Sequence, residues 1–141
     1  MLNKLACLVV MVILLFVSLD AFAESAERGL NQTRYDHTLS VYAGLSISGS
    51  TALCNGKGRG LYSDTTTSIQ VTLQRRPSGS NSWYGVTSWT DTANGTDPAS
   101  VCETYTVSAG YSYRVRVRCQ IKDSNGNVLE TVYQYSTICT I

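Results

Sequence analysis

The fold of this chain is decided by residues 110–122, GYSYRVRVRCQIK, and by the segment that follows them to Ile141. Apolar and polar side chains alternate along these residues, which predicts a β-strand with one buried face. The apolar positions are Tyr111, Tyr113, Val115, Val117, Cys119 and Ile121, and the polar ones include Arg114, Arg116, Arg118 and Lys122. Residues 123–127, DSNGN, break the pattern, and residues 128–139 resume it. We therefore expect a long hairpin with an apolar inner face and a cationic outer face.

The register of this hairpin depends on the length of its turn. A three-residue loop, Ser124-Asn125-Gly126 with Gly126 in the left-handed conformation, pairs Asp123 with Asn127. It sets apolar residues against apolar or aromatic ones, with the pairs Ile121–Leu129, Val117–Tyr133 and Val115–Tyr135. A two-residue turn would instead bury polar groups, with the pairs Ile121–Glu130 and Val117–Gln134. Because a one-residue slip inverts every side chain, we expect the three-residue register.

The first 23 residues have the features of a secretory signal peptide. Lys4 supplies a basic start, residues 8–17 form an apolar run that is short for a membrane span, and Ala21-Phe22-Ala23 is an A-x-A-like cleavage site. An uncleaved anchor is the alternative. We expect cleavage after Ala23, secretion and no stable membrane insertion afterwards. A flexible polar leader at 24–38 should then precede a single β-sandwich domain at 39–141.

Turn signals divide the rest of the chain into short strands. Residues 39–61 should form the first two strands, and 68–92 a hairpin with a loose loop at 77–81. A polar loop at 90–100, a strand at 101–107 and a corner at 108–110 follow. Gly56, Gly58 and Gly60 lack the spacing of a phosphate-binding loop, and they predict a strand face on which another backbone or an aromatic ring packs closely. The pattern predicts an all-β sandwich of about seven antiparallel strands.

Composition excludes several classes of function. The net charge of +1 is too close to neutral to make nucleic acid or an acidic membrane surface the main partner. The single histidine, His37, falls in the predicted leader beside Asp36, and no nucleophile motif or paired carboxylates accompany it. We therefore expect a protein that is not an enzyme and that binds no cofactor and no metal.

The cysteines predict disulfides. Of the five, Cys7 leaves with the signal peptide, and the other four lie in an exported domain at spacings too wide for a zinc site. Their positions along the predicted strands favour the pairs Cys54–Cys139 and Cys102–Cys119. Strict alternation of inward and outward side chains, however, turns Cys102 outward unless a bulge intervenes. The alternative is Cys54–Cys119, an immunoglobulin-like link between sheets, with Cys102–Cys139.

Two groups of side chains are candidates for a binding surface. Trp83, Tyr84 and Trp89 lie on one short segment and could stack on sugar rings. We expect one of the two tryptophans to fill the core, and the sequence does not decide whether the other is exposed. Arg114, Arg116 and Arg118 form a cationic strip. The favoured interpretation is that this strip is a solvated outer face of the sheet, whose charges discourage edge-to-edge pairing. Asn31-Gln32-Thr33 and Asn94-Gly95-Thr96 match the glycosylation sequon, which matters only in a eukaryotic host.

The order of hairpin, polar loop, short strand, corner and Tyr-Ser-Tyr-Arg-Val-Arg-Val resembles a fibronectin type III or immunoglobulin-like domain. In that pattern Tyr111–Ile121 is strand F and Val128–Cys139 strand G, while Ala52 and Leu53 stand where strand B usually has a tryptophan. The mature chain also resembles small exported proteins of unknown function from clostridia and related Gram-positive bacteria. That resemblance rests on the segments at 45–48, 71–75, 86–89, 110–115 and 123–127. It implies a fold and an exported location, and it carries no activity.

The sequence alone leaves the partner unidentified. The favoured function is a non-catalytic binding or interaction module at the cell envelope or a host surface, whose ligand could be a glycan, a cell-wall polymer or a protein surface. The alternative is a secreted antimicrobial or toxin-like effector, which a small disulfide-bonded domain would permit.

Overall fold

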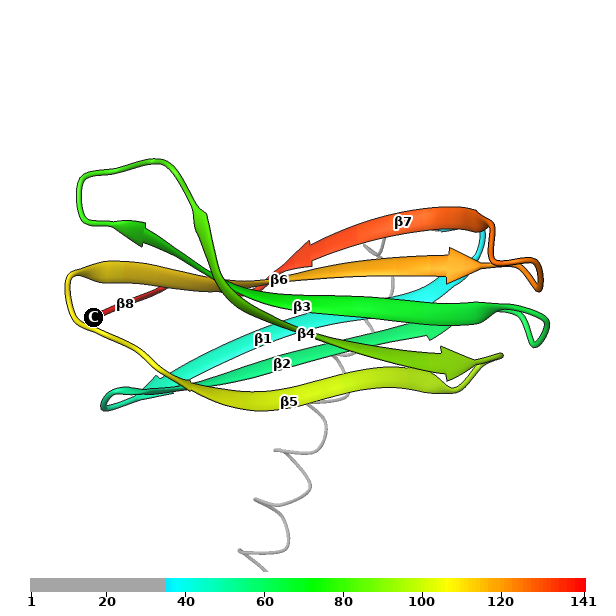
Figure 1. Ribbon diagram of the computed structural model, residues 1–141, viewed down its shortest axis with the longest axis horizontal. Helices are drawn as coiled ribbons and strands as arrows, with labels where there is room; N and C mark the ends of the chain where they lie inside the picture. The colour runs from blue at the N-terminus through cyan, green and yellow to red at the C-terminus, as the bar shows by residue number, and fades with distance from the viewer. Residues whose placement is uncertain (1–34) are drawn as a thin grey trace, which may run out of the picture. The chain divides into compact units, whose positions relative to one another are not determined.

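The computed structural model describes residues 35–141, which form a sandwich of two antiparallel sheets (Figure 1). The smaller sheet has the order β1-β2-β5, with β1 at Thr38–Ser48, β2 at Thr51–Gly60 and β5 at Pro98–Thr106. The larger sheet has the order β4-β3-β6-β7, and β8 also pairs with β6. Its strands are β3 at Thr66–Pro77, β4 at Tyr84–Asn94, β6 at Tyr111–Lys122, β7 at Val128–Tyr135 and β8 at Cys139–Thr140. The prediction of an all-β, antiparallel sandwich is confirmed.

The strand order places β6, the first strand of the C-terminal hairpin, inside the larger sheet and β7 at its edge. β6 lies between β3 and β7, while β1, β2 and β5 form the opposite layer. This distribution is that of an immunoglobulin-like sandwich, with β4 hydrogen-bonded to β3. The predicted signal peptide, the leader up to residue 34 and the sequon at Asn31 lie outside the described residues.

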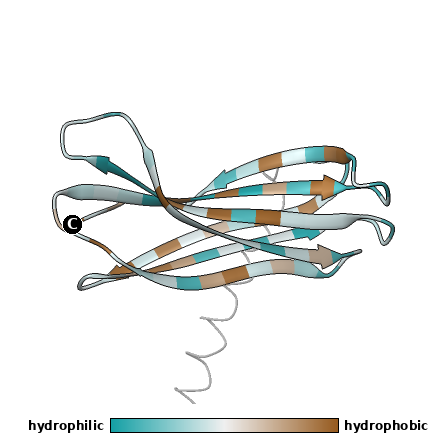
Figure 2. Ribbon diagram, in the orientation of Figure 1, coloured by the Kyte–Doolittle hydropathy of each residue, from teal (hydrophilic) through white to brown (hydrophobic). Residues whose placement is uncertain are grey.

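The core follows the alternation of β6. Tyr113, Val115, Val117, Cys119 and Ile121 are at most 1% exposed and face the interior, together with the buried side chains of β3. Hydrophobic and hydrophilic residues accordingly alternate along β6 in Figure 2. The predicted inner face of this strand is confirmed.

A column of glycines on β2 faces the same interior. A Cβ atom on Gly56 would lie 2.2 Å from Cγ2 of Val71, and one on Gly58 would lie 2.6 Å from Cγ2 of Ile69. The glycines therefore do mark a closely packed strand face, as their spacing predicts. Branched side chains of β3 fill the space at these two positions, where the sequence led us to expect a backbone or an aromatic ring.

The corner before β6 is fixed by a single tyrosine. The hydroxyl of Tyr113 donates to the Ser108 carbonyl oxygen at 3.1 Å and accepts from the Ser108 N–H at 3.0 Å. Tyr113 is 1% exposed, so its ring is a core residue while its hydroxyl ties the connection from β5 to the sheet. Gly110 completes the corner with a φ of 92°.

The predicted register of the C-terminal hairpin is wrong beyond its turn. The three-residue loop itself forms, with Gly126 at φ 83° and the Asp123 N–H donating to the Asn127 carbonyl at 2.9 Å. A bulge then shifts the pairing, so that Lys122 faces Val128 while Ile121 faces Glu130. Leu129 is the extra residue of the bulge. Val117 consequently faces Gln134, and Arg118 faces Tyr133.

The bulge has a physical reason in what it buries and exposes. It turns Val132 into the core, where it is 4% exposed, and turns Tyr133 and Tyr135 to the outer face. It also directs Glu130 toward the start of β1, where the carboxylate accepts hydrogen bonds from the Asp36 and His37 N–H groups and from the Thr38 hydroxyl. The Glu130 carboxylate, which the register with a two-residue turn appeared to bury, is therefore hydrogen-bonded to these donors.

Three element boundaries differ from the sequence-based expectation. β4 runs to Asn94 and β5 starts at Pro98, so the polar loop predicted at 90–100 shrinks to a tight turn around Gly95. The return strand is interrupted, because β7 ends at Tyr135 and β8 resumes at Cys139. The compact domain begins at Tyr35, which packs against the core, so residues 35–38 belong to the sandwich.

Candidate binding face

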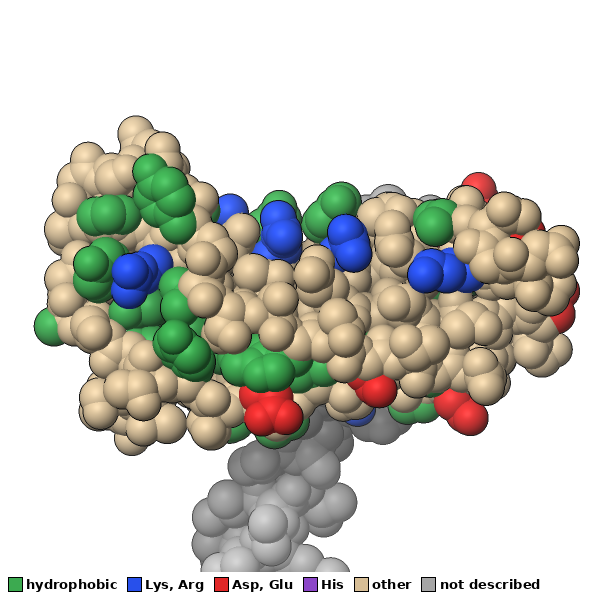
Figure 3. Space-filling model, in the orientation of Figure 1, with side chains coloured by type: hydrophobic (Ala, Val, Ile, Leu, Met, Phe, Trp, Pro, Cys, Tyr) green, Lys and Arg blue, Asp and Glu red, His purple; other side chains and the backbone are tan. Residues whose placement is uncertain are grey.

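The predicted cationic strip lies on the outer face of the larger sheet. Arg114, Arg116 and Arg118 alternate with the buried residues of β6, and their neighbours on β3 are Gln74, Thr72 and Gln70. On the other side, Tyr135 and Tyr133 of β7 pair with Arg116 and Arg118. Lys and Arg side chains accordingly stand in a row along the sheet in Figure 3, with hydrophobic side chains between them.

The aromatic rings hold the guanidinium groups in place. The guanidinium carbon of Arg114 lies 4.3 Å from the ring centroid of Trp83 and 4.4 Å from that of Tyr135. Arg76 lies 4.8 Å from the same Trp83 ring, and Arg116 lies 5.9 Å from the ring of Tyr133. The tyrosine contacts are diagonal across the β6–β7 pair, because each arginine reaches the tyrosine paired with the next arginine. The group is a stack of alternating cations and rings.

Arg114 is the most constrained member of this group. Its Nε–H donates to Oε1 of Gln74 at 2.9 Å, which fixes the plane of the guanidinium. Burial lowers the pKa of Arg114, Tyr135 raises it, and the nearby charges of Arg116 and Arg76 lower it again. The group remains a cation at neutral pH, because arginine titrates far above that range.

The face carries positive charge without compensation from acidic residues. The cations on its β3 and β6 positions are Arg76, Arg114, Arg116, Arg118 and Lys122. The acidic residues of the described part all lie at inward-facing, edge or turn positions: Asp36, Asp64, Asp91, Asp97, Glu103, Asp123 and Glu130. The domain therefore gathers five of its eight described cations on this face, apart from its acidic residues, although its chain is nearly neutral overall with a net charge of +1.

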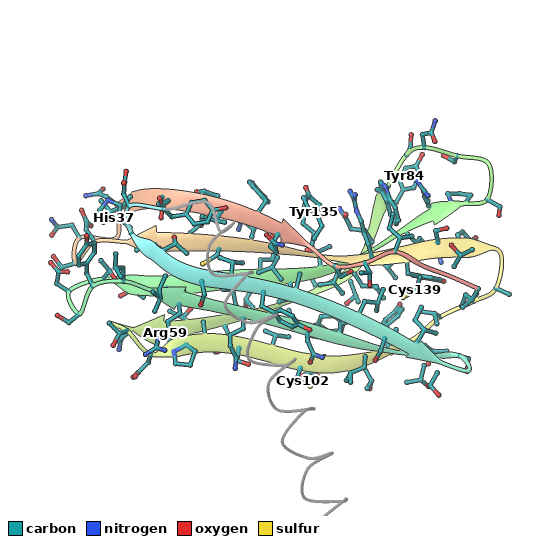
Figure 4. The ribbon with its side chains drawn as sticks, turned by 180° about the vertical axis from the view of Figure 1, so that it is seen from behind. His37, Arg59, Tyr84, Cys102, Tyr135 and Cys139 are labelled. Carbon is teal, nitrogen blue, oxygen red and sulfur yellow. The ribbon has the colours of Figure 1, made fainter. Side chains whose placement is uncertain are left out.

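The three aromatics predicted as one platform do not act together. Trp83, just before β4, contacts the arginines of the outer face. Trp89 pairs with the buried Val71 and packs against the core, as expected for one of the two tryptophans. Tyr84 pairs with Arg75, whose β6 partner is the buried Tyr113, so Tyr84 belongs to the opposite side of the sheet. It is 59% exposed there and is labelled in Figure 4 near the projecting β3–β4 hairpin.

Sequence reasoning missed the two tyrosines of β7. Tyr133 and Tyr135 are 50% and 45% exposed and lie beside the arginines, whereas the predicted register placed them in the core. Figure 4 shows Tyr135 on the outer side of β7. The available signal was the apolar Val132, which can face the core only if the two tyrosines face outward.

The four described cysteines are free thiols, so neither predicted set of disulfides is present. Cys102 pairs with Asn55 and is exposed, while Cys119 is buried and faces Gly58, which keeps these two thiols on different sides of the smaller sheet. The alternative Cys54–Cys119 bridge fails because Cys54 lies four residues from Gly58 on β2, roughly 13 Å along the strand.

Cys139 and Cys54 have a common neighbour but no bond. The Cys139 thiol lies 4.0 Å from the Leu45 carbonyl oxygen, and Leu45 is the cross-strand partner of Cys54. Burial raises the pKa of the Cys54 thiol to about 11. Burial, and to a smaller extent the charge of Glu130, also raises the pKa of the Cys119 thiol to about 11. Both thiols are therefore protonated at neutral pH, which makes them unreactive.

Residues 35–141 offer little in the way of other kinds of site. No three His, Cys, Asp or Glu side chains in this range gather as metal ligands would. The same range contains no helix of the length and hydrophobicity that a transmembrane span requires. A hollow of about 300 Å³ on the smaller sheet is lined by Tyr42, Asn55, Lys57 and Cys102 among others.

Comparison with known proteins gives a distant likeness among solved structures. No protein-family model and no curated protein matches the sequence. A solved structure of catalytically inactive OgpA from Akkermansia muciniphila, in complex with an O-glycopeptide substrate, aligns with 74% of this chain at 17% identity and a TM-score of 0.37. The chain spans 30% of the length of that protein.

Proposed function

We propose that this protein is a secreted, non-catalytic binding module that attaches to a polymer or glycan at a cell envelope or host surface. The binding face is the outer side of β3, β6 and β7. The observation that carries the proposal is the stack of Trp83, Arg114 and Tyr135, in which the guanidinium lies within 4.4 Å of both ring centroids.

This stack supports binding because it is preorganised. A free arginine loses much side-chain entropy when it engages a ligand, and that loss reduces affinity. Here the two rings and the Gln74 hydrogen bond have already fixed the Arg114 side chain. The half-exposed rings of Tyr133 and Tyr135 offer apolar contact area next to it. The signal-like sequence at residues 1–23 supports an extracellular setting for such a face.

Tryptophan fluorescence can test the proposal, because only Trp83 lies on the proposed face. The Trp89→Phe variant keeps Trp83 as its single tryptophan, and the Trp83→Phe variant keeps only Trp89. Titration with solubilised cell-wall and surface-polysaccharide fractions should shift the emission of Trp89→Phe and leave that of Trp83→Phe unchanged.

Sedimentation of the wild-type protein with insoluble cell-wall material provides the second measurement. Binding in this assay together with a shift confined to the Trp83 signal supports the proposed face. Failure of the wild-type protein to bind any fraction in either assay would refute the function.

A further inference from the structure

The cations of the outer face form a line along one strand. Arg114, Arg116, Arg118 and Lys122 occupy alternate positions of β6, with Gln120 in the remaining place. Since a strand advances about 3.3 Å per residue, successive arginines start roughly 7 Å apart and the line from Arg114 to Lys122 extends over about 26 Å. Arg76 lengthens it at one end, because it pairs with Ser112 of β6. Such a line matches an extended ligand with repeated negative charges.

The flanks of the line select for a second property of the ligand. Tyr133 and Tyr135 stand along one side and are about half exposed, while the other side is bordered by the polar side chains of Gln70, Thr72 and Gln74. Exposed rings offer flat apolar surface, on which the C–H face of a sugar ring can pack. Of these three side chains, Thr72 and Gln74 are buried and Gln70 is partly exposed, so the Gln70 amide can exchange hydrogen bonds with sugar hydroxyl groups.

We propose that the ligand is a linear acidic polysaccharide that lies along β6, with its carboxylate or sulfate groups on the arginines and its sugar rings against Tyr133 and Tyr135. This inference rests on the proposed function and names the ligand class of the same face. Arginine suits the role, because its planar fork of donors binds carboxylate and sulfate oxygens in pairs.

The geometry at Trp83 disfavours the stacking of nucleic-acid bases on that ring, whereas the exposed rings of Tyr133 and Tyr135 make oligo(dT) the competing ligand to be tested. Binding of a single-stranded nucleic acid depends on bases stacking on bare aromatic faces. The largest ring of this face, Trp83, already has the guanidinium groups of Arg76 and Arg114 within 4.8 Å of its centroid. A sulfated or carboxylated sugar chain needs no intercalation between these groups.

The test compares polymers that share a backbone and differ in charge. Isothermal titration calorimetry at several salt concentrations would measure binding of dextran sulfate, neutral dextran, polygalacturonate, its methyl ester and oligo(dT). We expect binding of the sulfate and the uronate, and none of the two neutral polymers. The logarithm of the association constant should fall linearly with the logarithm of the salt concentration, because a polyanion releases counterions on binding.

Charge-neutralising variants locate the site. Arg118→Gln should weaken binding of dextran sulfate roughly tenfold and lower the salt slope by about 0.8. Lys57→Gln removes the same charge from the exposed outer face of the smaller sheet and provides the matched control, with affinity within about twofold of the wild type because distant charges are screened. Equal effects of the two variants would overturn the inference. Tighter binding of oligo(dT) than of dextran sulfate and polygalacturonate would also overturn it.

The outcomes also separate the two proposals. If envelope fractions bind at Trp83 while dextran sulfate and polygalacturonate do not, the binding module stands and the acidic ligand is wrong. If neutral dextran binds as well as dextran sulfate, the ligand class is again wrong. If no polymer or fraction binds, the proposed function fails first.

Discussion

At the scale of single residues, Gly56 and Gly58 let branched side chains of the larger sheet pack directly against β2. Their Cβ positions are occupied by Val71 and Ile69 of β3, and Gly58 would also approach the Cys119 thiol at 2.8 Å. Sequence alone indicates a closely packed face, because glycine recurs at every second position. It could not name the side chains that fill the space, because they lie on another sheet whose alignment depends on the whole fold.

Replacing Gly58 with alanine should destabilise the domain. The added methyl group would overlap Ile69 and Cys119, and overpacking of this kind costs roughly 1–3 kcal/mol. Urea unfolding followed by circular dichroism measures the change. Gly85→Ala is the matched control, because its Cβ would meet Thr72 at an ordinary 3.6 Å. Equal stability of the two variants would contradict the close packing of the sheets at β2.

The described cysteines should differ sharply in reactivity. Cys102 is exposed, whereas Cys54 and Cys119 are 0% exposed, and burial raises the pKa of both buried thiols to about 11. Native protein treated briefly with iodoacetamide should be alkylated at Cys102 and protected at Cys54 and Cys119. Peptide mass spectrometry reads out the sites, and a guanidinium-unfolded sample shows the full reactivity of all four. Protection of Cys102 in native protein and after unfolding would indicate a disulfide at that position.

At the scale of elements, the β6–β7 hairpin shows where sequence reasoning succeeds and where it stops. The alternation of β6 and the three-residue loop with Gly126 in the left-handed region follow from local pattern, and both predictions are confirmed. The bulge at Leu129 does not follow from local pattern, because its advantage lies in distant contacts of Val132 and Glu130. Because the predicted register lacked this one-residue bulge, it placed Tyr133 and Tyr135 in the core and not on the binding face. For that reason the predicted register left these two tyrosines out of the candidate site, although the apolar Val132 next to Tyr133 was a signal for the observed pairing.

The contact of Glu130 with the start of β1 predicts a dependence of stability on pH. Partial burial raises the pKa of Glu130, but hydrogen bonds from Thr38, Asp36 and His37 and the charge of His37 together lower it below its ordinary value. A carboxyl whose pKa is lower in the folded state stabilises the fold above its unfolded pKa of about 4.3. That contribution is lost as the pH falls through the folded pKa. Glu130→Gln should therefore lose stability at pH 7 and differ less from the wild type near pH 3.

Thermal unfolding between pH 3 and pH 7 measures this difference. Glu103→Gln, at an exposed position of β5, is the control and should follow the wild-type curve at every pH. A Glu130→Gln curve parallel to that of the wild type would show that the carboxylate contact has no part in the acid sensitivity.

At the scale of the whole molecule, the domain includes residues that resemble a leader. Thr38 is 4% exposed, Tyr35 packs on the core, and the Leu61 N–H donates to the His37 carbonyl at 2.9 Å. The polar composition of this segment hid its place in the fold, because its hydrogen-bond acceptor Glu130 is more than 90 residues away in sequence. The sandwich class, in contrast, follows from repeated local signals that need no distant partner.

Shortened chains test this boundary. A chain that starts at Tyr35 should unfold cooperatively, whereas a chain that starts at Leu39 leaves the Glu130 carboxylate without its three donors. Loss of these hydrogen bonds to a charged group should destabilise the shorter chain by roughly 2 kcal/mol or more. Urea midpoints of the two chains measure the difference. Identical midpoints would show that residues 35–38 add nothing to the fold.

The separation of charge described for the outer face has a consequence for how the molecule meets any surface. A nearly neutral domain with five of its eight described cations on one face and its carboxylates elsewhere has a permanent dipole moment. An electric field therefore turns such a domain without pulling strongly on it. The Debye length is about 8 Å at physiological ionic strength. Within a few such lengths of a negatively charged surface, the domain would rotate until the outer face of β6 points toward that surface. Salt should then slow productive encounters by randomising the angle of approach, before any contact has formed.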